Sequence, residues 1–410
     1  MNIWILSPYN MPSKLGHLNR SFYFKRYLEK LGHKVTVFVD SYLHNNDDGQ
    51  MIKAGKIYSL YDDVDSCVFV KICNYKTSKF KRFYAMWQYH KNLLKIADKF
   101  EKPDVIIGEL FAGVTAIKLS RKYKCKNIIE IRDLWPETFV MLGLLVKENP
   151  IIKVLYQLEK WMYIKSDKII FTMEGGKDYI KEKRWDKSSG GKIDLKKLYH
   201  INNGVDLNQF NYNRYHFKIK DEDLENKDIF KVVYTGSIRM INDLGVLVNV
   251  AKKFKENGYN RIKLLIWGTG NELETLRRRI KYENLDNIIF KGQIKKKFIP
   301  YILSNSDINI LHSTSDIIAK YGSSENKTFD YLAAGKPILR TSNINYDFLL
   351  FNGAALAVEQ QNVDNIYEAI LDFYNMPKDR YNEMCKNSLN LAKEYDFKKL
   401  TDKLIKVIED

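Results

Sequence analysis

A strand–loop–helix–strand pattern that occurs twice along the chain constrains its fold more than any other feature of the sequence. Asn2–Leu6 is a short apolar run that ends in a turn cluster. Leu18–Leu31 then repeats apolar residues at helical spacing, and Val35–Val39 is a second apolar run. Apolar runs of this length predict buried strands, and their order around a helix predicts a βαβ unit, from which parallel sheets are built.

The same alternation continues along the N-terminal half and restarts after residue 205. In the N-terminal half we predict strands at Val105–Gly108, Asn127–Ile131 and Lys168–Thr172 and a helix at Ala112–Tyr123. In the C-terminal half we predict strands at Phe230–Thr235, Ile262–Trp267, Ile288–Phe290, Ile308–Leu311 and Ile338–Leu339, and helices at Leu244–Asn257, Glu272–Asn284, Lys297–Asn305 and Lys327–Ala334. Asn211–Asp228 is polar and short of apolar residues, which favours a linker or a surface excursion.

Two consecutive α/β sheets predict two Rossmann-like domains. We place the N-terminal domain at residues 1–205 and the C-terminal domain at 206–385. A final helical stretch, Tyr381–Asp410, is able to pack on either domain, and we expect residues 386–410 as a C-terminal helix for which a return to the N-terminal domain is one option. Ligands of such sheets bind at the carboxyl ends of the strands, so we expect the active site in a cleft between two facing domains.

Length and charge narrow the class of protein. At 410 residues the chain exceeds one compact core of the usual size. Its 67 basic and 50 acidic side chains give a formal net charge of +17, which attracts nucleic acid, phospholipid headgroups or phosphorylated small molecules. An AT-rich genome also explains part of this excess, because Lys, Asn and Ile are abundant together.

Cysteine usage and hydropathy indicate a compartment. Four Cys residues without a Cys-x-x-Cys pair favour a reduced, cytosolic environment. The N-terminus has no basic region before a long apolar run, so we expect no signal peptide. No uncharged apolar stretch approaches the roughly 18 residues that span a bilayer. We therefore expect a protein that does not cross a membrane but is able to lie on one.

The segment from Tyr321 to Pro337 carries the most chemistry. A loop of small residues runs into a helix start, where unpaired amides and the helix dipole favour an anion. The amides at that start belong to Ser323, Ser324 and Glu325. Lys327 adds a positive charge, and Asp330 is placed to accept hydrogen bonds from sugar hydroxyls. A plain loop, helix and glycine C-cap is the alternative on physical grounds.

This segment resembles the nucleotide-sugar signature of family 4 glycosyltransferases, which have the GT-B fold. In that family an acidic residue, seven others and a second acidic residue precede an Ala-x-Gly-x-Pro end, and the second acid binds the nucleotide ribose. The resemblance assigns that role to Asp330, while Gly322 stands at the position of the first acid. It also implies the fold class: α/β, GT-B, with two facing Rossmann-like domains and an interdomain cleft.

Further segments fit the resemblance in the expected order. They are Ile201–Phe210, similar to an interdomain Pro-Asn-Gly-Val-Asp element, Gly268–Glu272, similar to a Gly-x-Gly-x-Glu turn, and Leu285–Gly292, similar to the strand beside the base. Tyr234–Arg239 takes the place of the phosphate-binding segment, which makes Arg239 the expected diphosphate ligand, and Asn242 stands near the usual downstream Lys.

Residues 130–137, Glu-Ile-Arg-Asp-Leu-Trp-Pro-Glu, resemble a run in the subfamily that builds bacterial surface polysaccharides. Arg132 and Asp133 follow a predicted strand and are expected at its carboxyl end, facing the cleft. Asp133 or Glu137 is then placed to orient or deprotonate an acceptor hydroxyl. The alternative is that Asp133 caps a turn and pairs with Arg132. In the resemblance, Gly16 lets the backbone approach the sugar phosphate closely.

Metal and dinucleotide sites receive little support. Asp63-Val64-Asp65 resembles a cation-binding pair of other glycosyltransferases, but its acidic surroundings favour a solvated turn. The His residues have no metal-binding spacing, and the Gly268–Gly270 turn lacks the third Gly of a dinucleotide fingerprint. We expect no metal and no cofactor.

A basic stretch with aromatic residues covers residues 76–97. No acidic residue occurs between Asp65 and Asp98, and aromatic side chains recur there at helical spacing: Phe80, Phe83, Tyr84 and Trp87. One interpretation is a helix whose aromatic face packs on the first sheet. Another is a helix at an anionic membrane surface. Single-stranded nucleic acid is a third interpretation, but no nucleic-acid motif accompanies the stretch, so we expect no nucleic-acid partner.

These observations predict a retaining glycosyltransferase. We expect transfer from a nucleotide-sugar, UDP-linked, to a saccharide acceptor carried on a polyprenyl diphosphate, in bacterial surface polysaccharide biosynthesis. The expected place is the cytoplasmic face of the cell membrane. The alternatives are a GT-B sugar-nucleotide epimerase and a non-enzymatic polyanion-binding protein.

Overall fold

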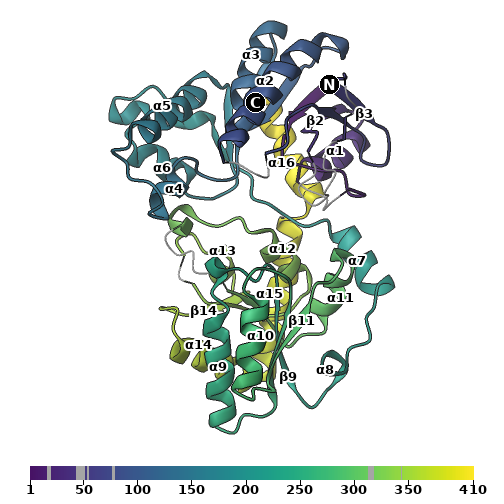
Figure 1. The fold of residues 1–410 in the computed structure, drawn as a ribbon, viewed down its shortest axis with the longest axis vertical. Helices are drawn as coiled ribbons and strands as arrows, with labels where there is room; N and C mark the ends of the chain where they lie inside the picture. Colours follow the sequence, from purple (N-terminus) through teal and green to yellow (C-terminus); the bar gives the residue numbers. More distant parts are fainter. Residues whose placement is uncertain (16–19, 43–50, 53–54, 76–78, 313–317, 343) are drawn as a thin grey trace. The chain divides into compact units, whose positions relative to one another are not determined.

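The computed structural model describes residues 1–410 except 16–19, 43–50, 53–54, 76–78, 313–317 and 343. The chain divides into two compact units (Figure 1). Unit 1 comprises Met1–Asn202 and Leu400–Asp410, and unit 2 comprises Asn203–Lys399. The final residues of the chain therefore belong to the same unit as the first ones.

Unit 1 is built on a sheet with the strand order β3-β4-β2-β1-β5-β6-β7-β8. The strands are β1 (Asn2–Leu6), β2 (Lys34–Asp40), β3 (Tyr58–Tyr61), β4 (Cys67–Val70), β5 (Val105–Glu109), β6 (Lys126–Ile131), β7 (Lys168–Phe171) and β8 (Leu198–His200). All pairs are parallel except the antiparallel edge pair β3–β4. The strand order turns at β1, whose neighbours are β2 on one side and β5 on the other. Such a switch point is where ligands bind in open α/β sheets.

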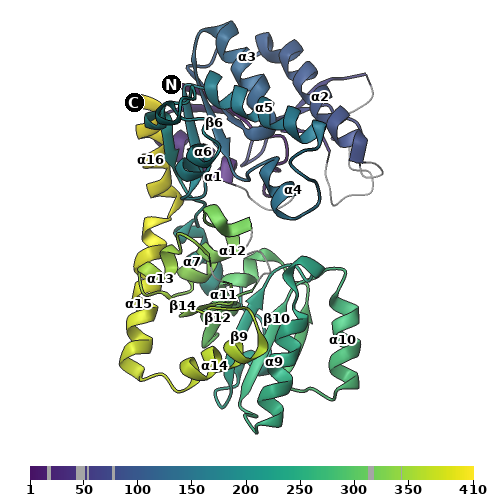
Figure 2. The same ribbon diagram turned by 90° about the vertical axis from the view of Figure 1, so that its left-hand side faces the viewer.

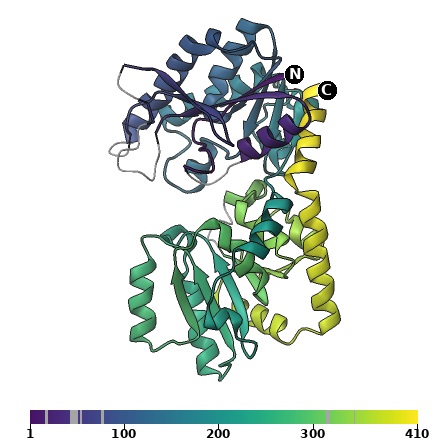
Figure 3. The same ribbon diagram turned by 90° about the vertical axis from the view of Figure 1, so that its right-hand side faces the viewer.

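Helices cover both faces of this sheet. They are α1 (Arg20–Lys30), α2 (Lys79–Ile96), α3 (Gly113–Tyr123), α4 (Glu137–Met141), α5 (Pro150–Lys165), α6 (Gly176–Glu182) and the end of α16 (Phe397–Glu409). Buried side chains of α2 and α3 form one core with β1, β2, β4 and β5. On the other face, α1 and the end of α16 lie side by side, purple and yellow in Figure 3. The last turn of α16 is held where Lys168 pairs with Asp410 at 2.9 Å.

Unit 2 has an all-parallel sheet with the order β11-β10-β9-β12-β13-β14. The strands are β9 (Phe230–Thr235), β10 (Ile262–Trp267), β11 (Ile288–Gly292), β12 (Ile308–Leu311), β13 (Ile338–Arg340) and β14 (Ala355–Ala357). Along β10, Leu264 and Ile266 enter one core, whereas Leu265 and Trp267 enter the other. The strand reads as a continuous apolar run because both faces are buried. Its switch point lies between β9 and β12.

The helices of unit 2 form a layer on each face of the sheet (Figure 2). They are α7 (Leu207–His216), α8 (Glu222–Glu225), α9 (Gly245–Glu256), α10 (Leu273–Tyr282), α11 (Ile299–Ser304), α12 (Asn326–Ala333), α13 (Phe348–Phe351), α14 (Val363–Tyr374) and α15 (Lys378–Glu394). One core contains side chains of α9, α10 and α14. The opposite core contains side chains of α7, α11, α12, α13 and α15.

Two expectations from the sequence differ from the structure. The polar segment Asn211–Asp228 contains helical turns rather than a plain linker, because Asp206 caps α7 by accepting from the Gln209 amide at 2.9 Å and Phe210 is buried. The final helical stretch is not continuous. The chain between α15 and α16 forms a bridge with Val205, whose amide donates to the Tyr395 carbonyl at 3.0 Å.

Candidate functional site

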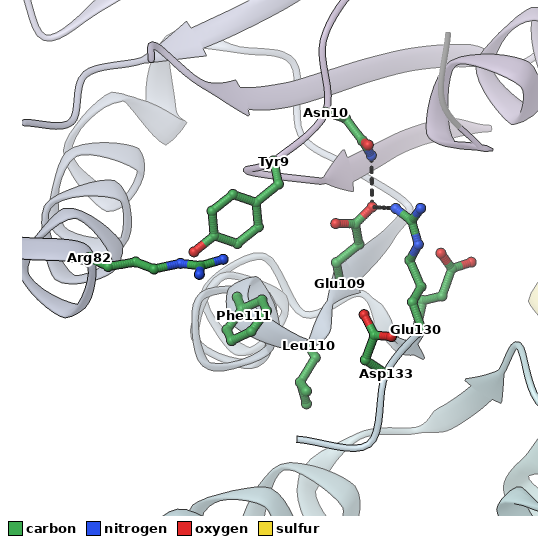
Figure 4. A pocket seen from close by; sticks show the side chains of 9 residues that line it. Tyr9, Asn10, Arg82, Glu109, Leu110, Phe111, Glu130 and Asp133 are labelled. Atoms are coloured by element: carbon green, nitrogen blue, oxygen red, sulfur yellow. Dashed lines mark hydrogen bonds and ion pairs between the residues drawn. The ribbon is translucent and has the colours of Figure 1, made fainter. Parts of the chain in front are cut away.

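A pocket of about 340 Å³ opens at the switch point of the unit 1 sheet (Figure 4). Its lining comes from the carboxyl ends of β1, β5 and β6 and from α2: Tyr9, Asn10, Arg82, Glu109, Leu110, Phe111, Glu130, Arg132 and Asp133. Charged side chains dominate one end of the pocket and aromatic side chains the other. The sequence placed Arg132 and Asp133 at the carboxyl end of their strand, and both line this pocket.

Glu109, the last residue of β5, is the centre of the polar end. Its Oε1 accepts a hydrogen bond from Asn10 Nδ2 at 2.8 Å and one from Arg132 Nη1 at 3.0 Å. Two hydroxyls, of Ser7 and Ser21, also donate to this oxygen. Glu109 is only 7% exposed, so these donors replace the water that a buried carboxylate needs.

The Arg132 guanidinium is surrounded by acidic side chains. Its ion pair is with Glu109 and not with Asp133, which answers the alternative raised by the sequence. Burial lowers the pKa of Arg132, but Glu109, Glu130 and Asp133 outweigh burial and raise it. Arg132 therefore remains cationic. Asp133 is exposed and extends the acidic rim of the pocket (Figure 4).

A buried ion pair includes Glu130 of the pocket lining. Arg20 Nε donates to Glu130 Oε2 at 2.9 Å, and the two side chains are 1% and 6% exposed. The other guanidinium nitrogens of Arg20 donate to the backbone carbonyls of Ile201 and Asn202, at 2.8 Å for Ile201. Arg20 thereby links α1 to β6 and to Ile201 and Asn202, the last residues of the first segment of unit 1, in one buried network.

Aromatic rings lie at the other end of the pocket, where Tyr9 and Phe111 line it, and the row of rings continues beyond the lining. The rings of Tyr9 and Phe111 lie 5.4 Å apart, those of Phe111 and Trp135 lie 5.4 Å apart, and Phe139 continues the row 6.2 Å from Trp135. Arg82 of α2 lies over the Tyr9 ring at 5.2 Å. We call Tyr9, Phe111, Trp135 and Phe139 the aromatic wall. Half-exposed rings of this kind offer apolar faces to a sugar or a lipid.

Glu137 has a different environment. It is buried at the start of α4, where its Oε2 accepts from the Tyr156 hydroxyl and pairs with Lys183. It does not belong to the lining of the pocket. The carboxylate therefore holds α4 against α5 and α6, and of the two acids proposed for acceptor chemistry only Asp133 faces the pocket.

The start of α12 lies at the switch point of unit 2. In the described part of the chain, no acceptor takes the amide hydrogens of Ser323 and Glu325. Ser324 has another partner, because its hydroxyl accepts from the Asn203 amide at 3.1 Å and its carbonyl accepts from Asn203 Nδ2 at 2.7 Å. The Ser324 side chain therefore anchors this loop within unit 2.

Lys327 and Asp330 follow on the first turns of α12. Lys327 Nζ lies 3.4 Å from the carbonyl oxygen of His312 and 5.1 Å from the centre of the Tyr234 ring. Asp330 is half-buried, and burial raises the pKa of its carboxyl. Hydrogen bonds donated by hydroxyl groups of a ligand would favour its charged form.

His312, directly after β12, was not singled out in the sequence. Burial is the main cause that lowers its pKa to about 4, with Lys327 contributing, so its ring is neutral at pH 7. Its Nε2 lies 3.0 Å from the Asp243 carbonyl, which requires a donated proton, and its Nδ1 lies 2.7 Å from the Thr341 hydroxyl. The ring thus fixes the end of the loop that carries Arg239.

That loop is also supported by two glycines of the turn after β10. The Arg239 side chain is exposed and has no hydrogen bond or ion pair with any residue that the structure describes. A Cβ on Gly268 would lie 1.8 Å from the Gly236 carbonyl oxygen, and one on Gly270 would lie 1.9 Å from that of Ile238. The Gly-x-Gly turn therefore serves close backbone packing beneath the Arg239 loop.

We expect Gly270→Ala to displace the Arg239 loop, because backbone atoms cannot yield as a flexible side chain can. The expected cost in stability is about 1–3 kcal/mol, as for other overpacked sites. Thermal unfolding measures the loss of stability. Calorimetric titration with UDP measures the effect of the displaced loop on nucleotide binding. Gly245→Ala is the matched control, because its new Cβ would meet nothing closer than 3.4 Å. Equal behaviour of the two variants would contradict this role of the turn.

Gly16 lies outside the described residues. The turn expected to be solvated around Asp63 and Asp65 is partly packed, because Asp65 is buried and binds Arg26 through both carboxylate oxygens, at 2.7 and 3.0 Å. Over the residues with described positions, no three His, Cys, Asp or Glu side chains gather as a metal site.

The basic stretch forms helix α2. If its aromatic residues packed on the sheet they would be buried, but those whose side chains are described are exposed. Residues 76–78 and the side chains at 79 and 80 lie outside the described part. The face that packs on the sheet consists of Ala85, Tyr89, Leu93 and Ile96. Phe83, Tyr84 and Trp87 are 50–53% exposed. The aromatic stripe is therefore not the packing face. None of the described helices is both long and apolar enough to cross a bilayer.

Comparison with protein families finds two matches in succession. The model described as Glycosyltransferase Family 4 matches residues 19–209, and the model described as Glycosyl transferases group 1 matches residues 216–410. A comparison with curated protein sequences finds no match.

Solved structures with the same fold align over the whole chain. An E. coli trehalose-6-phosphate protein bound with UDP-2-fluoro glucose is 11% identical, with a TM-score of 0.74 over 100% of this chain and 99% of that chain. Sucrose-phosphate synthase from Thermosynechococcus elongatus is 14% identical, with a TM-score of 0.71 over 100% and 98%. HepE from Anabaena in complex with UDP-glucose is 13% identical, with a TM-score of 0.65 over 100% and 99%. Because two glycosyltransferase models match successive parts of a chain with two Rossmann-like units, this protein belongs to the glycosyltransferases of the GT-B fold.

Proposed function

We propose that the protein transfers a sugar from a UDP-linked donor to a lipid-linked saccharide, with retention of the anomeric configuration, in the synthesis of a bacterial surface polysaccharide. The observation that carries the donor half is the start of α12, where no acceptor among the described residues takes the amide hydrogens of Ser323 and Glu325 and where Lys327 adds a cation. The bound UDP and UDP-glucose of structures with this fold support a uridine nucleotide.

The donor site has the charges that sugar transfer requires. When the bond between the anomeric carbon and the diphosphate breaks, negative charge grows on the leaving phosphate. Positive groups stabilise that charge best when they are already in position and need little reorganisation. Lys327, the amides of Ser323 and Glu325 and the exposed guanidinium of Arg239 supply them, and Asp330 accepts hydrogen bonds from the ribose hydroxyls.

The acceptor half is assigned to the pocket of unit 1. Asp133 orients the attacking hydroxyl from the exposed rim, and Arg132 binds a phosphate or hydroxyl of the acceptor. Glu109 positions Arg132 through the 3.0 Å contact of their side chains. The aromatic wall offers faces for a sugar ring or the first isoprene units of a polyprenyl diphosphate.

A membrane-borne acceptor also fits the exposed face of α2. Tyr84 and Trp87 are stacked with ring centres 5.6 Å apart, and Lys91 lies 4.7 Å over the Trp87 ring. Aromatic rings and lysines in this order suit the headgroup region of an anionic membrane. The proposed location is the inner face of the cell membrane.

Calorimetric titration with UDP and GDP tests the donor assignment, and UDP binding is expected. Turnover is measured as UDP release from a panel of UDP-sugars with membrane extract as acceptor. Arg239→Ala and Lys327→Ala are each expected to lower the turnover rate by more than about tenfold. Arg278→Ala is the matched control, since Arg278 is exposed on α10, outside the site. Absence of binding of both nucleotides removes the donor proposal, and normal rates in both variants reassign the phosphate site. Release of a monosaccharide with UDP, without any acceptor, would instead favour an epimerase.

A further inference from the structure

Seven exposed apolar side chains cluster between positions 142 and 158 of unit 1. They are Leu142, Leu144, Leu145, Val146, Ile151, Val154 and Leu158, which we call the α5 apolar surface. Leu144, Val146, Ile151 and Val154 are 63–67% exposed. Single apolar residues are common on protein surfaces, but seven exposed ones in one short stretch of sequence are typical of an interaction site. Figure 2 shows α4, which ends just before this segment, and α5, which carries its second half, on the side of unit 1 that faces the viewer.

The stripe on α5 is a second apolar face and not a core face turned outward. Ile152, Glu159, Met162 and Tyr163 are already buried against the unit. Their side packs closely on α3, because a Cβ on Gly113 would lie 2.8 Å from Met162 Sδ. The exposed residues Ile151, Val154 and Leu158 follow the i, i+3, i+7 spacing of a separate stripe.

The charged side chains of residues 142–165 are mostly basic. Four lysines occur in this stretch: Lys147, Lys153, Lys160 and Lys165. Glu159 is fully buried, where the hydroxyls of Tyr163 and Tyr179 donate to its carboxylate at 2.7 and 2.8 Å. Glu148 is the one exposed acid between positions 142 and 165, all of which the structure describes. Protein interfaces are depleted in lysine, whereas anionic membrane surfaces attract it.

The loop part of the α5 apolar surface is hydrogen-bonded to α4. The Phe139 carbonyl accepts hydrogen bonds from the amides of Leu144 and Leu145 at 3.0 and 3.3 Å. Phe139 is the last ring of the aromatic wall, which continues through Trp135 to the pocket. Backbone hydrogen bonds thus link the loop part of the α5 apolar surface to the helix that carries Phe139.

We propose that the α5 apolar surface binds a membrane that contains anionic lipid, with its apolar side chains at the boundary of headgroups and acyl chains and its lysines on lipid phosphates. This contact is additional to the one proposed for α2. The inference rests on the proposed function in one respect, the membrane-borne acceptor that such docking presents to the pocket.

Co-sedimentation with vesicles of phosphatidylcholine and phosphatidylglycerol, about three to one, tests the proposal. The full chain is expected to bind these vesicles, more weakly at high salt. The triple variant Leu144→Gln, Val146→Gln, Val154→Gln is expected to bind at least about tenfold more weakly, because it removes three apolar groups that the membrane would partly bury. Tyr282→Gln is the matched control, since Tyr282 is 89% exposed in unit 2, and it is expected to bind as the unaltered chain does.

Wild-type affinity in the triple variant, or no vesicle binding by the unaltered chain, overturns the proposal. So does a change from dimer to monomer in the triple variant by light scattering, because a second copy of the chain would then cover the surface. UDP titration separates this proposal from the donor assignment. A chain that fails to bind UDP but loses vesicle binding in the triple variant contradicts the proposed function and supports the membrane surface.

Discussion

Replacing Glu109 with glutamine is expected to lower turnover by about 100-fold or more while UDP affinity stays unchanged. The substitution keeps the shape of the side chain but removes the negative charge that four donors share at one oxygen. Arg132 then loses its ion-pair partner and the orientation proposed for acceptor binding. Losses of this size follow when a fixed charge near a reacting centre is removed. UDP release with membrane extract as acceptor is the measurement.

Glu159→Gln is the matched control for this variant. Glu159 is also a buried carboxyl group bound by hydroxyls, but it lies between α5 and α6, outside the pocket. Burial raises its pKa to about 8, so at pH 7 the carboxyl is mostly protonated and glutamine imitates it. Near-normal activity is expected for Glu159→Gln. A Glu109→Gln enzyme with turnover close to wild type and an unchanged unfolding temperature would show that the carboxylate has no part in acceptor chemistry.

The sequence indicates Arg132 and Asp133 but not Glu109, because it shows local patterns and not contacts between residues far apart in the chain. Arg132 and Asp133 directly follow an apolar strand, and that local signal predicts a position at the edge of the sheet. Glu109 ends β5 in the same way. It lies one residue beyond the predicted strand, so the local pattern indicates it less strongly than it indicates Arg132 and Asp133. Its role depends on Asn10 and Ser7, which are 99 and 102 residues away. Such convergence is set by the strand order and not by any local pattern.

Glu137 illustrates the opposite case. Its place in a motif suggested acceptor chemistry, yet Lys183, 46 residues away, pairs with it inside the unit. The two strand patterns predicted the α/β class because apolar period and helix spacing are local properties. Side-chain burial within a helix is decided by the neighbouring layer, which is why the exposed aromatic stripe of α2 and the two apolar faces of α5 emerged only from packing.

The other large effect is expected on stability, at the Arg20–Glu130 pair. Glu130→Leu is expected to lower the stability of unit 1 by about 3–5 kcal/mol, because it leaves the Arg20 cation buried without its partner. Arg20→Leu is expected to cost a similar amount, since it leaves Glu130 and two backbone carbonyls unsatisfied. Urea unfolding followed by tryptophan fluorescence reports mainly on unit 1, because all six tryptophans except Trp267 lie there.

The double variant separates a paired interaction from two independent losses. With both charges removed, no uncompensated ion remains, so its cost is expected to be clearly smaller than the sum of the single costs. Glu101→Ala is the control for an exposed pair in the same unit, since Lys34 and Glu101 are 65% and 61% exposed, and a change of at most about 1 kcal/mol is expected. Strict additivity of Arg20→Leu and Glu130→Leu would mean that the carbonyl contacts of Arg20, and not its ion pair, hold α1 to the end of the unit.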